Sequence, residues 1–403
     1  MTPAWLLLTR LDGMIARLDQ AQKAIAAQGQ NTRLQKRIGA DLEQRLLKHT
    51  ETLKGRRMKV ASAGTVPDNA WSEVKSYASA MLLDECLLYL QAARSRGPDV
   101  AADLCEITDA LFEELAHKAT SVAWKSFSVF AAEDSFDVLT RVIRVRYPVS
   151  GVWDIPVAVH EFGHFLSGFV RHIRTDGSAS LVFQEHRISI VPPHATMPTP
   201  PTLGDPKPNP LPDQGIDWQA WVDEIFADVF ATYAVGPSFA CSCLLFRFDP
   251  SDATDERDGK HPSYAKRAYV ILRTLRYLNN EQQCQGKLAP MIELLEKSWQ
   301  ASCNAARRSP DVPGNYQTWL DGQVSAIYDM LKTDERMLQF DEWEAAHAKA
   351  SWLVTPPASP GEFTIVELLN AAWICRFNEN NIPERLSENF VKLARRKTER
   401  YDR

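Results

Sequence analysis

The sequence lacks the features that mark membrane, secreted and nucleic-acid-binding chains. It has no run of roughly 18 apolar residues, the length that a membrane-spanning helix needs. Its first eight residues are apolar, but Arg10 and Asp12 follow at once, without a basic start or a small-residue cleavage site, so we expect no signal peptide. The net charge of −5 and the isoelectric point near 6.0 argue against general nucleic-acid binding.

The sequence also lacks a cysteine framework. Its seven cysteines are an odd number, lie scattered along the chain and form no Cys-x-x-Cys pair. Such a set is typical of reduced thiols in an intracellular protein and not of a secreted disulfide scaffold. The composition therefore predicts a cytoplasmic protein without a transmembrane segment.

One short motif carries the functional hypothesis: His160-Glu161-Phe162-Gly163-His164. Two histidines four residues apart on a helix project from the same face, at the spacing with which two imidazoles bind one Zn²⁺. The glutamate between them can take a proton from zinc-bound water and deliver it to a leaving amine. The motif predicts zinc ligands at His160 and His164, with Glu161 as the general base.

The residues around the motif predict a buried helix. Residues 155–173 are hydrophobic on nearly every helical face, Asp154 is a suitable N-cap, and Pro156 fits the first turn. Gly163 costs about 1 kcal/mol against alanine inside a helix, so we expect another group to approach closely there. The alternative is a core helix whose two histidines are satisfied by ordinary neighbours.

A second apolar helix, over residues 217–235, offers the third ligand that a catalytic zinc needs. It ends at Gly236-Pro237. Glu224 and Asp228 stand four residues apart on one face of this helix. We interpret Glu224 as the ligand and Asp228 as the group that holds a ligand histidine through its other ring nitrogen.

Two alternatives for the third ligand are weaker. Glu185 and His186 follow His164 by about twenty residues, but their segment alternates like a strand and has no paired acid behind it. The longer metzincin pattern fails, because Ser167 and Val170 occupy positions that it requires for other residues.

Three blocks in order resemble a known family. The HEFGH motif is followed by EIFAD at 224–228 and then by His261-Pro262-Ser263 with Arg267. This order resembles the gluzincin zinc metallopeptidases, most closely the branch of the CAAX prenyl protease and the HtpX-like peptidases, over roughly residues 140–280. The resemblance implies zinc ligands His160, His164 and Glu224, a general base Glu161, an oxyanion donor or extra ligand His261, and a site-building Arg267. The familiar members of that branch are largely membrane or envelope proteins, which this chain does not match.

We therefore expect a mainly α fold with a small β-sheet: a zincin-like metallopeptidase core beside an N-terminal helical bundle. The predicted domains are residues 1–135, a catalytic core over 136–280 with a proline-rich insert at 192–212, and a helical region over 281–403 with helices near 364–377 and 384–400. Residues 140–147 alternate like a strand, which is either a candidate edge for an extended substrate or an ordinary structural strand. The N-terminal helices suit a scaffold, an oligomerisation unit, or a site for substrate or a regulatory partner.

The predicted function is that of a regulated and selective zinc-dependent endopeptidase acting on a protein or peptide substrate. Zn²⁺ is the expected cofactor, and His261 or one of the tyrosines Tyr233, Tyr264 and Tyr269 would stabilise the oxyanion. The alternative function is a catalytically inactive scaffold or binding protein that contains zinc for structure.

Overall fold

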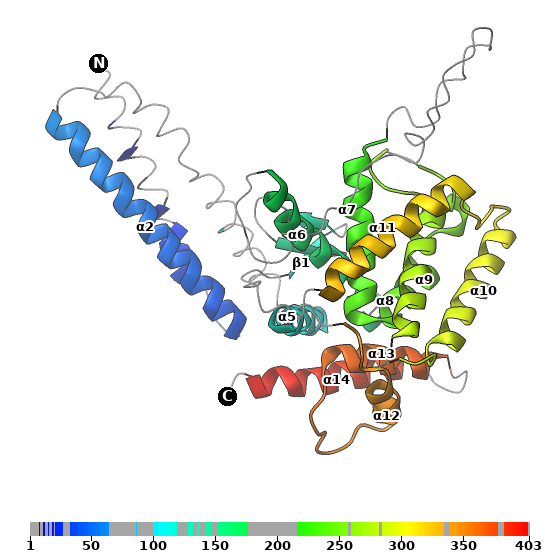
Figure 1. Ribbon diagram of the computed structural model, residues 1–403. Helices are drawn as coiled ribbons and strands as arrows, with labels where there is room; N and C mark the ends of the chain where they lie inside the picture. Colours follow the sequence, from blue (N-terminus) through cyan, green and yellow to red (C-terminus); the bar gives the residue numbers. More distant parts are fainter. Residues whose placement is uncertain are drawn as a thin grey trace, which may run out of the picture. The chain divides into compact units, whose positions relative to one another are not determined.

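The computed structural model describes the chain in segments, and the helices dominate them (Figure 1). The described residues are 33–63, 100–118, 128–131, 135–137, 142–146, 151–175, 216–256, 259–281, 284–333, 339–377 and 383–401, with isolated positions before residue 27 and at Cys86. Within these ranges, no helix combines the length and the apolarity that crossing a membrane requires.

The chain divides into two compact units. One comprises Met1–Asp109, Lys125–Tyr147 and Lys397–Arg403, and the other comprises Ala110–Trp124 and Pro148–Arg396. The sequence predicted three domains, 1–135, 136–280 and 281–403. Residues 281–396 belong to the same unit as the helices of the predicted catalytic core and pack with them.

The first unit contains helix α2 (Arg33–Ala63) and three short strands, β1 (Ser128–Ala131), β2 (Ser135–Asp137) and β3 (Val142–Arg146). β3 pairs in parallel with β1 and antiparallel with β2, so it is the central strand of the order β1-β3-β2. The strand predicted over residues 140–147 is confirmed as β3, but its interpretation as a free edge for substrate is wrong. Both sides of β3 already carry hydrogen-bonded partners.

The predicted small β-sheet beside the site is also wrong. The unit that carries the candidate site has no strand among its described residues, and the protein is mainly helical. The two apolar helices of the motif need cover on several faces. Other helices supply that cover, so the core of this unit contains no sheet.

The second unit consists of helices that lie around one central helix, α7. α6 packs against one side of α7, whereas α9 and α11 pack against others, and α12 packs on α13 (Figure 1). Its regular elements are η1 (Gly151–Trp153), α6 (Ile155–Thr175), α7 (Trp218–Val235), α8 (Pro237–Ser242), the π-helical turn η2 (Cys243–Arg247), η3 (Pro250–Asp252), α9 (Tyr264–Asn280), α10 (Ala289–Ala305), α11 (Gly314–Thr333), α12 (Trp343–Val354), α13 (Ile365–Arg376) and most of α14 (Pro383–Tyr401); α5 (Val100–Lys118) contributes its C-terminal part.

Local sequence signals set the ends of these helices. The predicted helices at 155–173 and 217–235 are confirmed as α6 and α7. The Asp217 carboxylate accepts a hydrogen bond from the Ala220 amide at 3.0 Å, as an N-cap does. α7 ends where Gly236 adopts a φ of 64°, a left-handed conformation that suits glycine, and Pro237 then opens α8. The helix predicted near 364–377 is α13, which begins with a capping box formed by Thr364 and Glu367.

Candidate metal centre

The two motif histidines lie one turn apart on α6 and face each other. The Nε2 atoms of His160 and His164 are 3.1 Å apart, and their rings are nearly perpendicular. His160 is buried, with 5% of its surface exposed, whereas the His164 side chain lies on the more open side at 21%. Two ring nitrogens at this distance converge on one point, as they would around a shared ion.

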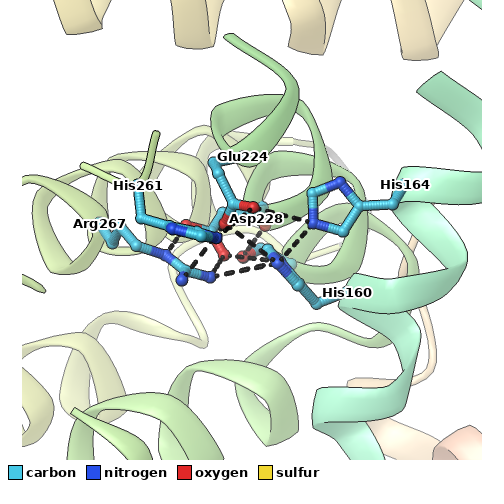
Figure 2. A network of polar contacts seen from close by, with 7 residues as sticks. His160, His164, Glu224, Asp228, His261 and Arg267 are labelled. Carbon is cyan, nitrogen blue, oxygen red and sulfur yellow. Dashed lines mark hydrogen bonds and ion pairs between the residues drawn. The ribbon is translucent and has the colours of Figure 1, made fainter. Parts of the chain in front are cut away.

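Glu224 reaches the same point from α7 (Figure 2). Its Oε1 lies 3.1 Å from His164 Nε2, and its Oε2 lies 3.4 Å from His160 Nε2. One ligand atom from each of His160, His164 and Glu224 lies within 4.8 Å of the others. The sequence-predicted ligands of two helices, sixty residues apart in the chain, therefore form one group.

The dimensions of this group fit a tetrahedral zinc site. Ligand atoms about 2.0–2.1 Å from Zn²⁺ at tetrahedral angles are separated by about 3.3 Å. The two ring nitrogens are 3.1 Å apart, and the Glu224 carboxylate approaches them to 3.1 Å through Oε1 and to 3.4 Å through Oε2, so the side chains lie near that spacing. Glu224 Oε2 is buried, and buried carboxylates need a cationic partner. The donor set of two imidazoles and one carboxylate is one that zinc uses in catalytic sites.

Asp228 holds His160 from behind. Its Oδ1 lies 2.9 Å from His160 Nδ1, one turn along α7 from Glu224, and the side chain is fully buried. This contact fixes the orientation of the ring and leaves Nε2 directed at the ligand group. The sequence predicted this arrangement, because the spacing of four residues places Glu224 and Asp228 on one face of α7.

Arg267, from the first turn of α9, closes the network. Its guanidinium donates two hydrogen bonds to Asp228, from Nε at 2.8 Å and from Nη2 at 2.7 Å. Nη1 also lies 3.3 Å from Glu224 Oε2. The bidentate pair neutralises the buried Asp228 carboxylate and fixes the distance between α9 and α7 at the site.

The charged groups of this network shift one another's pKa values. Burial and the Arg267 charge lower the pKa of His160, but Asp228 and Glu224 outweigh them and raise this pKa to about 9. Burial alone would raise the pKa of Glu224, yet His164 and Arg267 hold this pKa well below its usual range. Because a histidine must be neutral to bind zinc, a metal ion and a proton compete for His160.

His261 lies at the open side of the site. Its Nε2 is 3.5 Å from Glu224 Oε1, and 56% of its side chain is exposed. It comes from the segment before α9, and the Gly259 carbonyl in this segment accepts a hydrogen bond from the Asp217 amide at 2.8 Å. The structure thus brings His261 beside the ligand group without including it in that group.

The remaining catalytic candidates separate by position. Glu161 follows His160 on α6 and is 7% exposed. Tyr233 lies about 180° around α7 from Glu224 and packs on Tyr328. Tyr269 donates a hydrogen bond to Asp321 at 2.9 Å, away from the site. Neither of these two tyrosines faces the ligand group. Tyr264 lies nearer to the site, because it stacks on Phe248, and the Phe248 ring lies 5.3 Å from the Arg267 guanidinium carbon.

The predicted close approach at Gly163 is present. A Cβ at this position would lie 2.7 Å from the Ala227 Cα on α7 and 3.1 Å from its Cβ. α6 and α7 therefore touch backbone to backbone between the residues that carry the ligands. The sequence shows only the glycine; nothing in it identifies Ala227 as its contact.

Other site residues could not be found from the sequence. Phe239 of α8 stacks on the His160 ring at 6.2 Å with an interplanar angle of 8°. A single phenylalanine 79 residues after a histidine carries no spacing signal. The competing ligands Glu185 and His186 and the proline-rich insert at 192–212 lie outside the described residues.

We compared the chain with models of known protein families, with curated proteins and with solved structures, and found no match in any of the three.

Proposed function

We propose that this protein is a zinc-dependent endopeptidase with a gluzincin-like centre, and that it hydrolyses peptide bonds of a protein substrate. The observation that carries the proposal is the convergence of His160, His164 and Glu224 from two buried helices, with one ligand atom of each within 4.8 Å of the others. The glutamate that follows the first histidine supplies the group that hydrolysis needs beyond metal binding.

Each residue has a distinct task in this proposal. Zinc held there would polarise the scissile carbonyl and make a bound water more acidic. Glu161 would accept the proton of the attacking water and return it to the leaving amine. His261, exposed beside Glu224, would donate a hydrogen bond to the oxyanion. Asp228 and Arg267 would hold His160 and Glu224 in place.

The second candidate function is an inactive scaffold that binds zinc only for structure. Structural zinc sites have four protein ligands, whereas catalytic sites have three and keep a position open. In the described part of the chain the ligand group contains three residues, and His261 lies next to it without joining it. This difference favours the enzyme over the scaffold.

We further propose that the protein acts in the cytoplasm. The buried thiols of Cys241, Cys243, Cys284 and Cys303 form no disulfide. Burial raises the pKa of each of these thiols, which keeps them protonated and unreactive. Reduced, buried cysteines suit a reducing compartment.

Two measurements test the enzyme proposal. The purified chain should contain about one zinc, and the double variant His160→Ala, His164→Ala should contain none. Glu161→Gln should keep the zinc and lose the protein fragments that wild type produces when both are incubated with a cell proteome. Metal in the double variant would disprove the site, whereas full cleavage by Glu161→Gln would disprove the general base. Zinc without any Glu161-dependent cleavage would favour the scaffold.

A further inference from the structure

One lysine in the second unit is buried beside the candidate metal centre. Lys266 directly precedes Arg267 on α9, and only 9% of its side chain is exposed. A buried ammonium group is costly unless other groups compensate its charge. The contacts of Lys266 therefore show what its charge is used for.

Three segments surround the Lys266 ammonium group. Its Nζ lies 5.1 Å from the centre of the Trp221 ring on α7 and 4.4 Å from the centre of the Tyr316 ring on α11. It also forms an ion pair with Glu256, in the segment before α9. Cation–π contacts and an ion pair thus join α9, α7, α11 and that segment through one charge.

The ion pair joins two residues on either side of His261 in the sequence. Glu256 stands five residues before His261, and Lys266 stands five residues after it. A backbone hydrogen bond from Ala265 to the Ala253 carbonyl, 2.8 Å long, lies at the base of the same segment. His261 is therefore carried on a short connection whose two ends are tied together by Lys266.

The α7 contact of Lys266 lies close to the zinc ligand. Trp221 precedes Glu224 by three residues, which is about one helical turn, and it is completely buried. Two consecutive side chains of α9 thus contact neighbouring turns of α7. Lys266 contacts Trp221, and Arg267 contacts Asp228 and Glu224. A displacement of Lys266 would move both Arg267 and His261 relative to Glu224.

We propose that Lys266 is a positioning residue that fixes His261 and Arg267 against Glu224 by anchoring the start of α9 to Trp221, Tyr316 and Glu256. This inference rests on the proposed zinc centre, because it concerns the geometry of that centre. Lys266 touches none of the three ligands in this role and acts through its neighbours. It explains why a charge is buried here where an apolar side chain would fill the space at lower cost.

A second lysine of the same unit provides a matched control. Lys349 on α12 pairs with Glu367 at 2.9 Å, lies 5.8 Å from the Trp352 ring, and has 13% of its side chain exposed. It thus has the same kind of partners as Lys266, but these partners belong to α12 and α13. If Lys266 serves only the packing of the protein, Lys266→Met and Lys349→Met should have the same kinds of effect.

The test uses the full chain labelled with ¹⁵N only at its nine histidines, with the His261 signals assigned through His261→Gln. The side-chain nitrogen signals are recorded with and without Zn²⁺, and zinc affinity is measured by competition with a chromophoric chelator. We expect Lys266→Met to shift or broaden the His261 signals and to weaken zinc binding about tenfold, the lower end for residues that support ligands. Lys349→Met should lower the melting temperature but leave the His261 signals and the zinc affinity unchanged. Lys266→Arg, which keeps the positive charge, should leave the His261 signals and the zinc affinity at their wild-type values.

Unchanged His261 signals and unchanged zinc affinity in folded Lys266→Met would overturn the proposal. If Lys266→Met does not fold, Glu256→Gln removes the partner charge from a more exposed position, and the same His261 signals decide the question. A wild-type chain that binds no zinc would disprove the proposed function. The His261 signals of the metal-free protein would still report whether Lys266 positions that ring, so the two failures are distinguishable.

Discussion

At the scale of single residues, the two acids of the site differ in how their charges are compensated. Asp228 accepts two hydrogen bonds from Arg267 and contacts His160 Nδ1, so its buried carboxylate is fully engaged. Glu224 shares the Arg267 charge, with Nη1 3.3 Å from its Oε2, and its Oε1 lies 3.1 Å from His164 Nε2. Asp228 therefore contributes more to the stability of the metal-free protein, whereas Glu224 faces the two histidines with which it would share a cation.

This difference predicts opposite rank orders in two measurements. Glu224→Ala should weaken zinc binding more than Asp228→Ala, whose effect should be about 10–100-fold as for other residues that support ligands. Asp228→Ala should cost more stability, about 3–5 kcal/mol, because it leaves the Arg267 guanidinium buried without its main partner. Competition with a chelator measures the zinc affinity, and urea unfolding of the metal-free protein measures the stability. Glu185→Ala should leave zinc affinity at the wild-type value; a large loss would move the third ligand to Glu185.

His261 offers a second prediction at this scale. Because its side chain is largely exposed, His261→Ala should change the melting temperature little. If it donates to the oxyanion, turnover should fall by about 10²-fold or more, measured on a substrate found by the Glu161-dependent proteome comparison. A variant that loses stability while each folded molecule turns over normally would assign His261 to the fold.

At the scale of elements, the sequence identified α6 and α7 but not the contacts between them. The apolar pattern and Gly236-Pro237 predicted α7 closely, since these signals are local. The spacing of residues within one helix also placed Glu224 with Asp228 and His160 with His164. The distances between α6, α7 and α9 depend on packing between segments far apart in the chain, and neither Ala227 nor Phe239 could be identified as a contact.

The contact of Gly163 with Ala227 leads to a prediction about the proposed zinc site. In Gly163→Ala the new methyl group would overlap the α7 backbone, so the helices must separate. Overpacking of this kind costs about 1–3 kcal/mol, and separation of α6 from α7 should also weaken zinc binding. Gly322→Ala on α11 is the control, because a Cβ there meets nothing within 4 Å, and it should stabilise the protein by about 0.5–1 kcal/mol. Equal zinc affinity in both variants would contradict the role of the contact.

At the scale of the whole molecule, the predicted fold class failed in its β-sheet. Alternation in residues 140–147 is a local signal, and it does produce the short strand β3. Which unit a strand joins depends on long-range packing, and β3 belongs to the unit without the site. Helices α10 to α13 belong to the same unit as α7 and α9, and packing of this kind between distant segments is likewise not visible in a local pattern.

Because the three proposed ligands come from α6 and α7 of the second unit, we expect zinc to stabilise that unit selectively. A ligand that binds only the folded state at about 100 times its dissociation constant contributes about 2.7 kcal/mol. For a unit of this size each kcal/mol raises Tm by roughly 2–4 °C, so zinc should raise the transition of the second unit by about 5–10 °C. Calorimetry with and without a chelator measures the shift, and hydrogen exchange on α6 and α7 assigns the transition. The double variant His160→Ala, His164→Ala should show no zinc-dependent shift. An equal shift in that variant, or a shift confined to helix α2 of the other unit, would place the metal elsewhere in the chain.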